Sequence, residues 1–154
     1  MIKYNLNEIN YTAQVGDNQN YSESSLVIPE TVEYNSQTYD VTSIGDDAFA
    51  HCSNLTSVTF NNGLQTIWLS AFEGCSALTS ISIPASVTLI YEGAFGNCNN
   101  LTSITVDGEN GTFYSQGNCI INYCCPIKIG IDYYSFENAF KQANYVLVSK
   151  SNPS

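Results

Sequence analysis

Six cysteines are the residues of this chain with the widest chemical range, because thiols form disulfides, bind metals and act as nucleophiles. Cys52, Cys75 and Cys98 recur at a step of 23 residues. Equivalent positions in stacked chain segments lie about 5 Å apart, and their parallel side chains do not favour a disulfide. We therefore expect these three residues to be buried free thiols.

The other three cysteines, Cys119, Cys124 and Cys125, lie outside this step. An adjacent pair is difficult to use in a tetrahedral metal site without a second, clearly spaced pair. We therefore expect no bound metal. A disulfide from Cys119 to either of the other two stays an open alternative.

His51 is the only histidine, and the equivalent residues in the next two steps are Gly74 and Asn97, which are typical of turns. A catalytic histidine needs a nucleophile and an orienting partner, and the sequence indicates neither. We interpret His51 as an exposed turn residue, and we expect no catalytic residue and no cofactor.

Carboxylates are further candidates for catalysis or calcium binding. Paired acids hydrolyse glycosides only when they flank a cleft at a defined separation, and nothing in the sequence specifies a cleft. Residues 107–111 combine acidic residues and asparagine with glycine, but their spacing differs from that of an EF-hand loop, so we interpret them as a turn. The acidic residues expected in turns are Asp46, Asp47, Glu73 and Glu92.

An internal repeat must position these side chains. Segments 41–60, 64–83 and 87–106 align without a gap at a step of 23 residues. Such a unit cannot bury its own apolar face, so it is stable only when stacked on its neighbours. The shared positions are Ile44, Ile67 and Ile90; Ala48, Ala71 and Ala94; Phe49, Phe72 and Phe95; Leu55, Leu78 and Leu101; and Val58, Ile81 and Ile104.

Each unit predicts two strands and a turn. A Leu-x-x-Val/Ile-x-apolar run predicts a strand of a parallel sheet, because alternate side chains then point inward. An Ala-Phe-x-x-Cys segment predicts one tight helical turn. The second, shorter strand on the opposite side is predicted by three apolar pairs, Val41 with Ile44, Leu64 with Ile67, and Val87 with Ile90.

The whole chain, 1–154, is expected to form a single domain. Residues 1–25 predict an N-terminal cap, because Ile2, Tyr4 and Leu6 and then Ile9, Tyr11, Ala13 and Val15 alternate as two strands of a hairpin. Residues 26–106 hold the repeats, with a hairpin insertion near 33–40 whose turn is Asn35-Ser36. Residues 107–154 predict a degenerate repeat and a C-terminal cap, in which Ile131, Ser135, Phe136 and Ala139 follow the repeat and Tyr145 to Val148 form its strand.

The pattern from about Val41 to Val106 resembles the BspA-like class of leucine-rich repeats, whose unit has this length and this Ala-Phe-x-x-Cys signature. The resemblance implies a leucine-rich-repeat solenoid, a right-handed β-rich coil with a parallel sheet, second short strands, short helical turns and an N-terminal hairpin cap. Members of this class are linked to adhesion to host proteins and other cells. The resemblance therefore implies an extracellular or cell-surface location, but it defines no binding residue that carries over to this chain.

Two outward-facing sets of side chains are candidate partner-binding residues. One is a ladder of hydroxyls on the predicted parallel strands, suited to hydrogen bonds with a protein or a glycan; β propensity and solubility explain it equally. The ladder consists of Thr56, Ser57 and Thr59; Thr79, Ser80 and Ser82; and Thr102, Ser103 and Thr105.

The second set is Trp68 and Tyr91, which occupy the position of Gly45 in the first repeat. Relatives of this class usually have glycine there, and exposed aromatic residues are typical binding anchors. The alternative is that both rings only cover a hydrophobic seam or form a contact between copies of the chain.

The overall charge excludes several classes of partner. The chain has 4 Lys and no Arg against 14 Asp and Glu, a net charge of -10. Nucleic-acid binding needs a cationic surface, so we expect no nucleic-acid partner.

No apolar run approaches the roughly 20 residues of a membrane span, and Met1 is not followed by a leader pattern. We expect no membrane insertion.

These observations predict a non-catalytic interaction module at the cell surface or secreted, which binds a host extracellular or cell-surface protein in adhesion. A carbohydrate-binding module is the first alternative. A structural spacer of a larger surface protein is the second.

Overall fold

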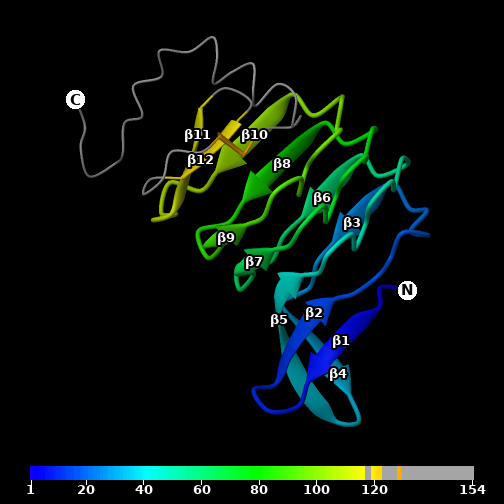
Figure 1. Ribbon diagram of the computed structural model, residues 1–154. Coiled ribbons are helices and arrows are strands. Elements are labelled where there is room, and N and C mark those ends of the chain that lie inside the picture. Colours follow the sequence, from blue (N-terminus) through cyan, green and yellow to red (C-terminus); the bar gives the residue numbers. More distant parts are fainter. Residues whose placement is uncertain (117–118, 123–127, 130–154) are drawn as a thin grey trace.

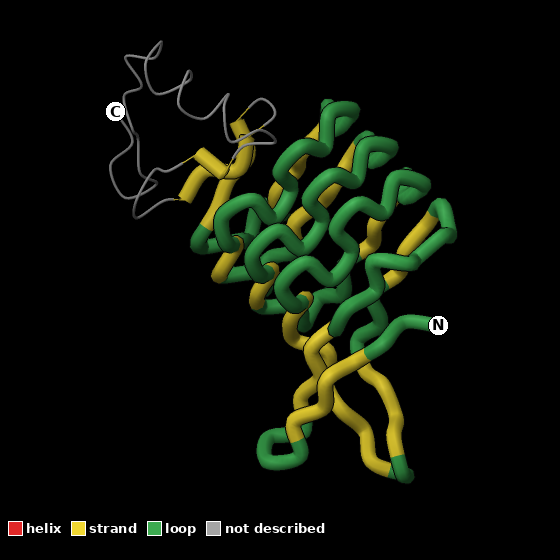
Figure 2. The backbone as a smooth tube through the Cα atoms, turned by 45° about the vertical axis from the view of Figure 1, so that its right-hand side comes forward, coloured by secondary structure: helices red, strands yellow, loops and turns green. Residues whose placement is uncertain are grey.

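The computed structural model describes residues 1–116, 119–122 and 128–129, and this part of the chain is a coil of strands and turns (Figure 1). Successive coils stack with strands on two sides, and two hairpins project from the N-terminal end (Figure 2). The strands are β1 (Tyr4–Asn7), β2 (Thr12–Val15), β3 (Ser25–Val27), β4 (Thr31–Tyr34), β5 (Gln37–Ile44), β6 (Ser57–Thr59), β7 (Thr66–Ile67), β8 (Ser80–Ile83), β9 (Leu89–Ile90), β10 (Ser103–Val106), β11 (Phe113–Gln116), β12 (Cys119–Asn122) and β13 (Lys128–Ile129).

The first side of the solenoid is a four-stranded parallel sheet in the order β10-β8-β6-β3. Ser57 pairs with Ser80, and Ser80 pairs with Ser103, so each strand is displaced by one repeat from its neighbour. Ser25 in β3 pairs with Ser57 and adds a fourth strand on the N-terminal side. The predicted parallel sheet is confirmed.

The opposite side is a six-stranded sheet in which β5, β7 and β9 run parallel, with Ile44, Ile67 and Ile90 in register. On its N-terminal side β2 pairs parallel with β5, and β1 pairs antiparallel with β2. The N-terminal hairpin cap is therefore present. It extends this sheet only, and β3 is the terminal strand of the four-stranded sheet.

The prediction that the second strand of this cap starts at Ile9 is wrong. Ile9 is 93% exposed and lies in a turn, where the Asn7 carboxamide oxygen accepts the N–H of Ile9 at 2.9 Å. Tyr11 then adopts a left-handed conformation with φ of 54°, which is incompatible with a strand. The strand consequently begins at Thr12.

An antiparallel hairpin lies where the sequence predicts an insertion, and consists of β4 paired with β5. Asn35 and Ser36 have φ of 50° and 61°, and two positive φ values are typical of a two-residue type I′ hairpin turn. The returning strand β5 runs without interruption into the six-stranded sheet, so the insertion extends a repeat strand.

The Ala-Phe-x-x-Cys segments form single hydrogen-bonded turns. In the first repeat, the N–H groups of Ala48, Ala50 and Cys52 donate to carbonyl oxygens three residues earlier, at 3.3, 3.0 and 3.2 Å. A continuous helix does not form, because Asp47 and His51 have φ of 52° and 62°. The equivalent residues of the next two repeats are also left-handed, namely Ser70, Gly74, Gly93 and Asn97.

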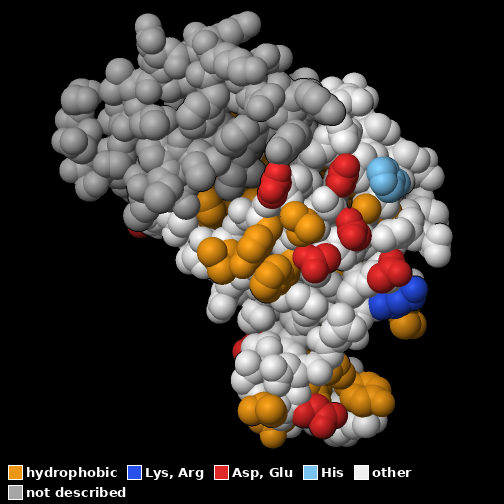
Figure 3. Space-filling view, viewed as in Figure 1, with side chains coloured by type: hydrophobic (Ala, Val, Ile, Leu, Met, Phe, Trp, Pro, Cys, Tyr) orange, Lys and Arg blue, Asp and Glu red, His pale blue; other side chains and the backbone are white. Residues whose placement is uncertain are grey.

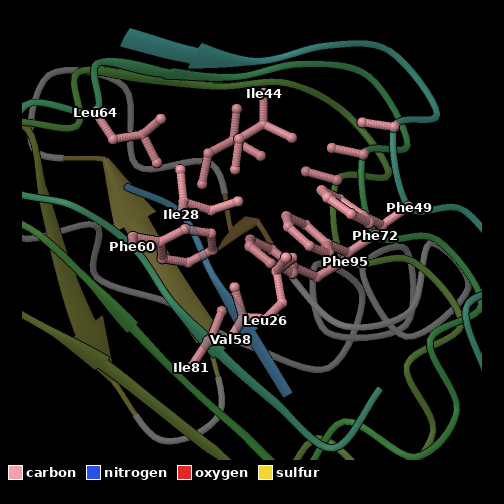
Figure 4. Close-up of a cluster of buried hydrophobic side chains, with 14 of the residues drawn as sticks. Leu26, Ile28, Ile44, Phe49, Val58, Phe60, Leu64, Phe72, Ile81 and Phe95 are labelled. Atoms are coloured by element: carbon pink, nitrogen blue, oxygen red, sulfur yellow. The ribbon is translucent and has the colours of Figure 1, made fainter. Parts of the chain in front are cut away.

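The sheets and turns enclose one apolar core (Figure 4). Phe49, Phe72 and Phe95 stack with ring centroids 5.3 and 5.6 Å apart. Tyr21 ends this stack on the N-terminal side, because its ring meets Phe49 edge-on at 5.7 Å. The four-stranded sheet adds a second buried row, Leu26, Val58 and Ile81.

After the last clear repeat, β11, β12 and β13 form a separate antiparallel sheet that the sequence analysis does not predict. Phe113 and Ile120 from this sheet join the core. The predicted degenerate repeat falls outside the described residues, namely Ile131, Ser135, Phe136, Ala139 and the strand from Tyr145 to Val148.

Candidate functional site

The three repeat cysteines are buried and free, as predicted. The thiol of Cys75 donates to the carbonyl oxygen of Phe49 at 3.2 Å, and the thiol of Cys98 donates to that of Phe72 at 3.1 Å. Burial raises the pKa of Cys75 to about 12 and the pKa of Cys98 to about 11. A nucleophilic cysteine needs a lowered pKa, so these thiols are not suited to nucleophilic catalysis. Their hydrogen bonds instead join neighbouring repeats.

Of the cysteines outside the 23-residue step, Cys119 is half-buried and free, and Cys124 and Cys125 lie outside the described residues. His51 is an exposed turn residue, as predicted, and its imidazole lies over Gly74 of the next repeat. In the described part of the chain, no three histidine, cysteine or acidic side chains are grouped to hold a metal.

Residues 107–111 are held in a turn by their own hydrogen bonds. The Asp107 carboxylate accepts the N–H of Glu109 at 2.9 Å. Asn110 is buried, and its carboxamide donates to the carbonyl oxygens of Pro84 and Val87 at 2.8 and 3.0 Å. This asparagine therefore serves the packing of the repeats.

Trp68 and Tyr91 stack on one another with ring centroids 4.6 Å apart and planes at 10°. The backbone N–H groups of Trp68 and Tyr91 donate to the carbonyl oxygens of Ile44 and Ile67, each at 2.9 Å. Both residues therefore lie directly after β7 and β9. Gly45 cannot carry a third ring, because a Cβ there would lie 2.9 Å from the carbonyl oxygen of Val15. Strand β2 thus ends the aromatic column on its N-terminal side.

Two leucines that the sequence analysis did not single out extend this pair. Leu69 is 47% exposed, Leu89 is 49% exposed and Tyr91 is 39% exposed, while Trp68 is half-buried. We call these four residues the aromatic patch. Figure 3 shows hydrophobic side chains gathered over β7 and β9, with acidic side chains beside them.

The repeat alignment contains the signal that could have found both leucines. Leu69 occupies the position of Asp46 and Glu92. In the register of the six-stranded sheet, Leu89 pairs with Thr66. Apolar residues therefore replace polar ones at two outward positions that are next to the aromatic pair.

All nine predicted hydroxyl residues are exposed, on the outer face of the four-stranded sheet. Strand β3 extends this face by a fourth strand, which the sequence analysis did not include. The added residues are Ser24, Ser25 and Val27. The hydroxyl of Thr56 donates to the carbonyl oxygen of Ser24 at 2.7 Å, so part of this ladder serves the backbone.

The structure brings the two aromatic residues together and the hydroxyls together, but on different surfaces. Both sheets direct their buried residues into the same core, so their outer faces point in opposite directions. A flat partner contacts only one of these faces at a time.

A model of the BspA type leucine rich repeat region matches residues 18–143, with 6 copies. No relative is found among curated proteins. Among the residues that the structure describes, no helix has the length and apolar character of a membrane span.

Among solved structures, a leucine-rich repeat protein from Bacteroides capillosus is 26% identical, with a TM-score of 0.52 over 68% of this chain and 93% of that one. A leucine rich cell surface protein from Faecalibacterium prausnitzii is 18% identical, with a TM-score of 0.39 over 79% of this chain and 56% of that one. The pneumococcal vaccine antigen PcpA is 13% identical, with a TM-score of 0.33 over 79% of this chain and 52% of that one.

The 23-residue step, the parallel stacking of the repeat strands in two sheets and the match over most of the chain agree with one another. Proteins of this repeat family are generally non-catalytic and generally bind proteins. The chain belongs to the family of BspA type leucine-rich repeat proteins.

Proposed function

We propose that this chain is a secreted or cell-surface adhesion module that binds a host extracellular or cell-surface protein through the aromatic patch. The location and the partner follow from what the family resemblance implies. One observation supports this choice of site. In β7, in β9 and directly after them, large apolar residues replace the usual glycine or polar residue of the repeat at Trp68, Leu69, Leu89 and Tyr91.

Such a patch is typical of protein interfaces. Large contiguous apolar patches on a protein surface mark interaction sites, and interface cores are enriched in tryptophan and tyrosine. The two rings are held in place by their mutual stacking and by strand hydrogen bonds, so little side-chain entropy is lost when a partner binds.

Covering the seam between repeats is the competing role of the pair. Ring stacking stabilises a fold by about 0.5–1.5 kcal/mol, so the pair contributes to stability whether or not it binds a partner. Stability and binding must therefore be measured on the same variants.

A glycan is the second candidate partner, and it favours the opposite surface. The hydroxyl ladder offers regularly spaced hydrogen-bonding groups on an uncharged face. In the aromatic patch, each ring uses one face on the other ring, which leaves less surface for stacking on a sugar.

The test is binding to arrays of host extracellular-matrix proteins and of glycans by three forms of the chain. These are the unchanged chain, the variant Trp68→Ala/Tyr91→Ala, and the variant Tyr11→Ala/Tyr34→Ala. The last is a matched control, because it also removes two exposed aromatic rings, from the hairpins instead of the patch. Circular dichroism checks that all three are folded.

We expect protein binding that the Trp68→Ala/Tyr91→Ala change abolishes and the control change preserves. Protein binding that survives in both variants moves the site away from the patch. Binding to glycans alone favours the carbohydrate-binding alternative, and no binding on either array favours the spacer alternative.

A further inference from the structure

The face of the Trp68 ring that points away from Tyr91 has an unusual environment. The ring stacks on Tyr91 of the following repeat, so its other face is directed toward the preceding repeat. The equivalent residue there is Gly45, which has no side chain. The preceding repeat consequently places no third ring on this face, and the side chain of Gln14 lies beside Gly45 instead.

Acceptor groups lie on both sides of Gly45. Asp46 is exposed, and its carboxylate accepts the N–H of Leu69 at 3.2 Å, which holds it close to Trp68. A carboxylate has about four acceptor sites, so it can accept further hydrogen bonds. The carboxamide oxygen of Gln14 lies 3.3 Å from the position of a Cβ at Gly45.

The charge around this face favours a cation. Residues 1–116 contain twelve of the 14 acidic residues but only one lysine, Lys3, and no arginine. Glu92 directly follows Tyr91 and is exposed. A field of one sign attracts partners of the opposite charge and repels anionic ones, such as sulfated glycans.

Building on the proposed function, we propose that the aromatic patch binds an arginine-bearing basic segment of the partner protein. The guanidinium stacks on the face of Trp68 that Tyr91 does not cover, and it donates to the carboxylate of Asp46. Arginine fits better than lysine, because its planar group stacks on aromatic rings and forms two parallel hydrogen bonds with a carboxylate. The chain supplies no arginine of its own to this face.

Trp68 is the only tryptophan, so its fluorescence reports directly on the site. The probes are an acetylated glycine-rich nonapeptide with three arginines, and the same peptide with three citrullines or three lysines. Citrulline keeps the shape of arginine and removes its charge. The variants are Asp46→Asn and, as a control with the same charge change on the inserted hairpin, Asp40→Asn.

We expect the arginine peptide to change the Trp68 fluorescence saturably, with affinity about tenfold above the citrulline peptide and about threefold above the lysine peptide. Asp46→Asn weakens binding about fivefold, and Asp40→Asn weakens it less than about twofold. Equal binding of the arginine and citrulline peptides overturns the proposal. Equal losses in the two variants also overturn it, because net charge alone then explains the attraction.

Failure here is distinguishable from failure of the proposed function. If an array protein depends on Trp68 and Tyr91 but the arginine peptide does not bind, the patch is an interface and the arginine preference is wrong. If the arginine peptide binds at Trp68 and no protein on the array does, the preference stands and the protein-binding role proposed above is unsupported.

Discussion

In each repeat, two residues at equivalent positions have a left-handed backbone conformation, which lets the chain change direction within a few residues. Gly74 has φ of 70°, and a Cβ there would collide with the imidazole of His51. Backbone strain and steric overlap therefore act together, and we expect Gly74→Ala to lower the free energy of unfolding by about 1–2 kcal/mol in urea denaturation.

Gly111→Ala is the control for this change, because nothing lies within 4 Å of a Cβ at Gly111 and its φ is not positive. Its effect should stay within about 0.5 kcal/mol. Adding His51→Ala to Gly74→Ala should recover part of the loss, since it removes the overlap but not the strain. Equal losses at the two glycines would contradict the account.

The buried thiol of Cys75 makes the free energy of unfolding fall at alkaline pH. An unfolded thiol has a pKa near its ordinary value of 9.0, whereas burial raises the pKa of folded Cys75 to about 12. Between these values the unfolded state releases its proton first. Stability is thus complete below about pH 9 and falls as the pH rises toward 12.

We expect the free energy of unfolding to decline less steeply above pH 9 in Cys75→Ala than in the unchanged chain, in urea denaturation at a series of pH values. Other groups that titrate in this range, such as the buried Tyr39, are present in both proteins and cancel in the comparison. Identical slopes would show that the Cys75 thiol does not keep its proton in the folded state.

Phe72 is the central ring of the buried stack, with Phe49 on one side and Phe95 on the other. Truncation to alanine removes both ring contacts and leaves a cavity, so we expect Phe72→Ala to cost about 3–5 kcal/mol. Tyr34→Ala, on the exposed inserted hairpin, is the control. A loss below about 1 kcal/mol for Phe72→Ala would mean that the ring is not a core residue.

Among the elements, the connections between the two sheets depend on buried asparagines. The carboxamide of Asn61 donates to the carbonyl oxygens of Pro29 and Val41 at 2.7 and 3.1 Å, and its oxygen accepts the N–H of Gly63 at 2.7 Å. Pro29 and Val41 flank the inserted hairpin. Asn61 therefore closes the base of this hairpin, as Asn110 joins the ends of a shorter connection.

We expect Asn61→Ala to cost about 1–3 kcal/mol, because it leaves buried carbonyl groups without a donor. The neighbouring Asn62 is exposed, and Asn62→Ala should change stability by less than about 0.5 kcal/mol. Chemical denaturation of the two variants is the measurement. Similar values for both would show that the carboxamide contacts carry no net energy.

The periodic elements could be predicted from the sequence, because one residue type recurs wherever the structure repeats one environment. Phe49 and Cys52 and their equivalents therefore located the core and the turns. Tyr11 was misplaced, because alternation of apolar residues does not reveal a left-handed backbone. Strands β11 to β13 were missed because they pair antiparallel, whereas the stacked repeats pair parallel.

The candidate site was predicted only in part. Trp68 and Tyr91 were found because they break the pattern at a position of glycine. Leu69 and Leu89 were missed because an isolated leucine is ordinary in a sequence, and its exposure depends on the register of the sheet.

At the scale of the whole molecule, the solenoid divides its residues between one buried core and two outer surfaces. Each repeat contributes its buried face to one shared core and its outer residues to two surfaces of opposite direction. One surface is uniform and rich in hydroxyls, and the other concentrates its irregular residues in the aromatic patch. Irregularity in a repeat protein marks the positions that stacking alone does not require.

We propose that the partner binds at the aromatic patch, and the indole N–H of Trp68 reports on this patch without any substitution. As the only tryptophan, this residue gives one indole signal in a two-dimensional ¹H–¹⁵N NMR spectrum. We predict that adding an array-selected partner shifts or broadens this signal in proportion to the bound fraction. An unchanged indole signal, with shifts confined to backbone amides of β6, β8 and β10, would place binding on the hydroxyl face and contradict the account.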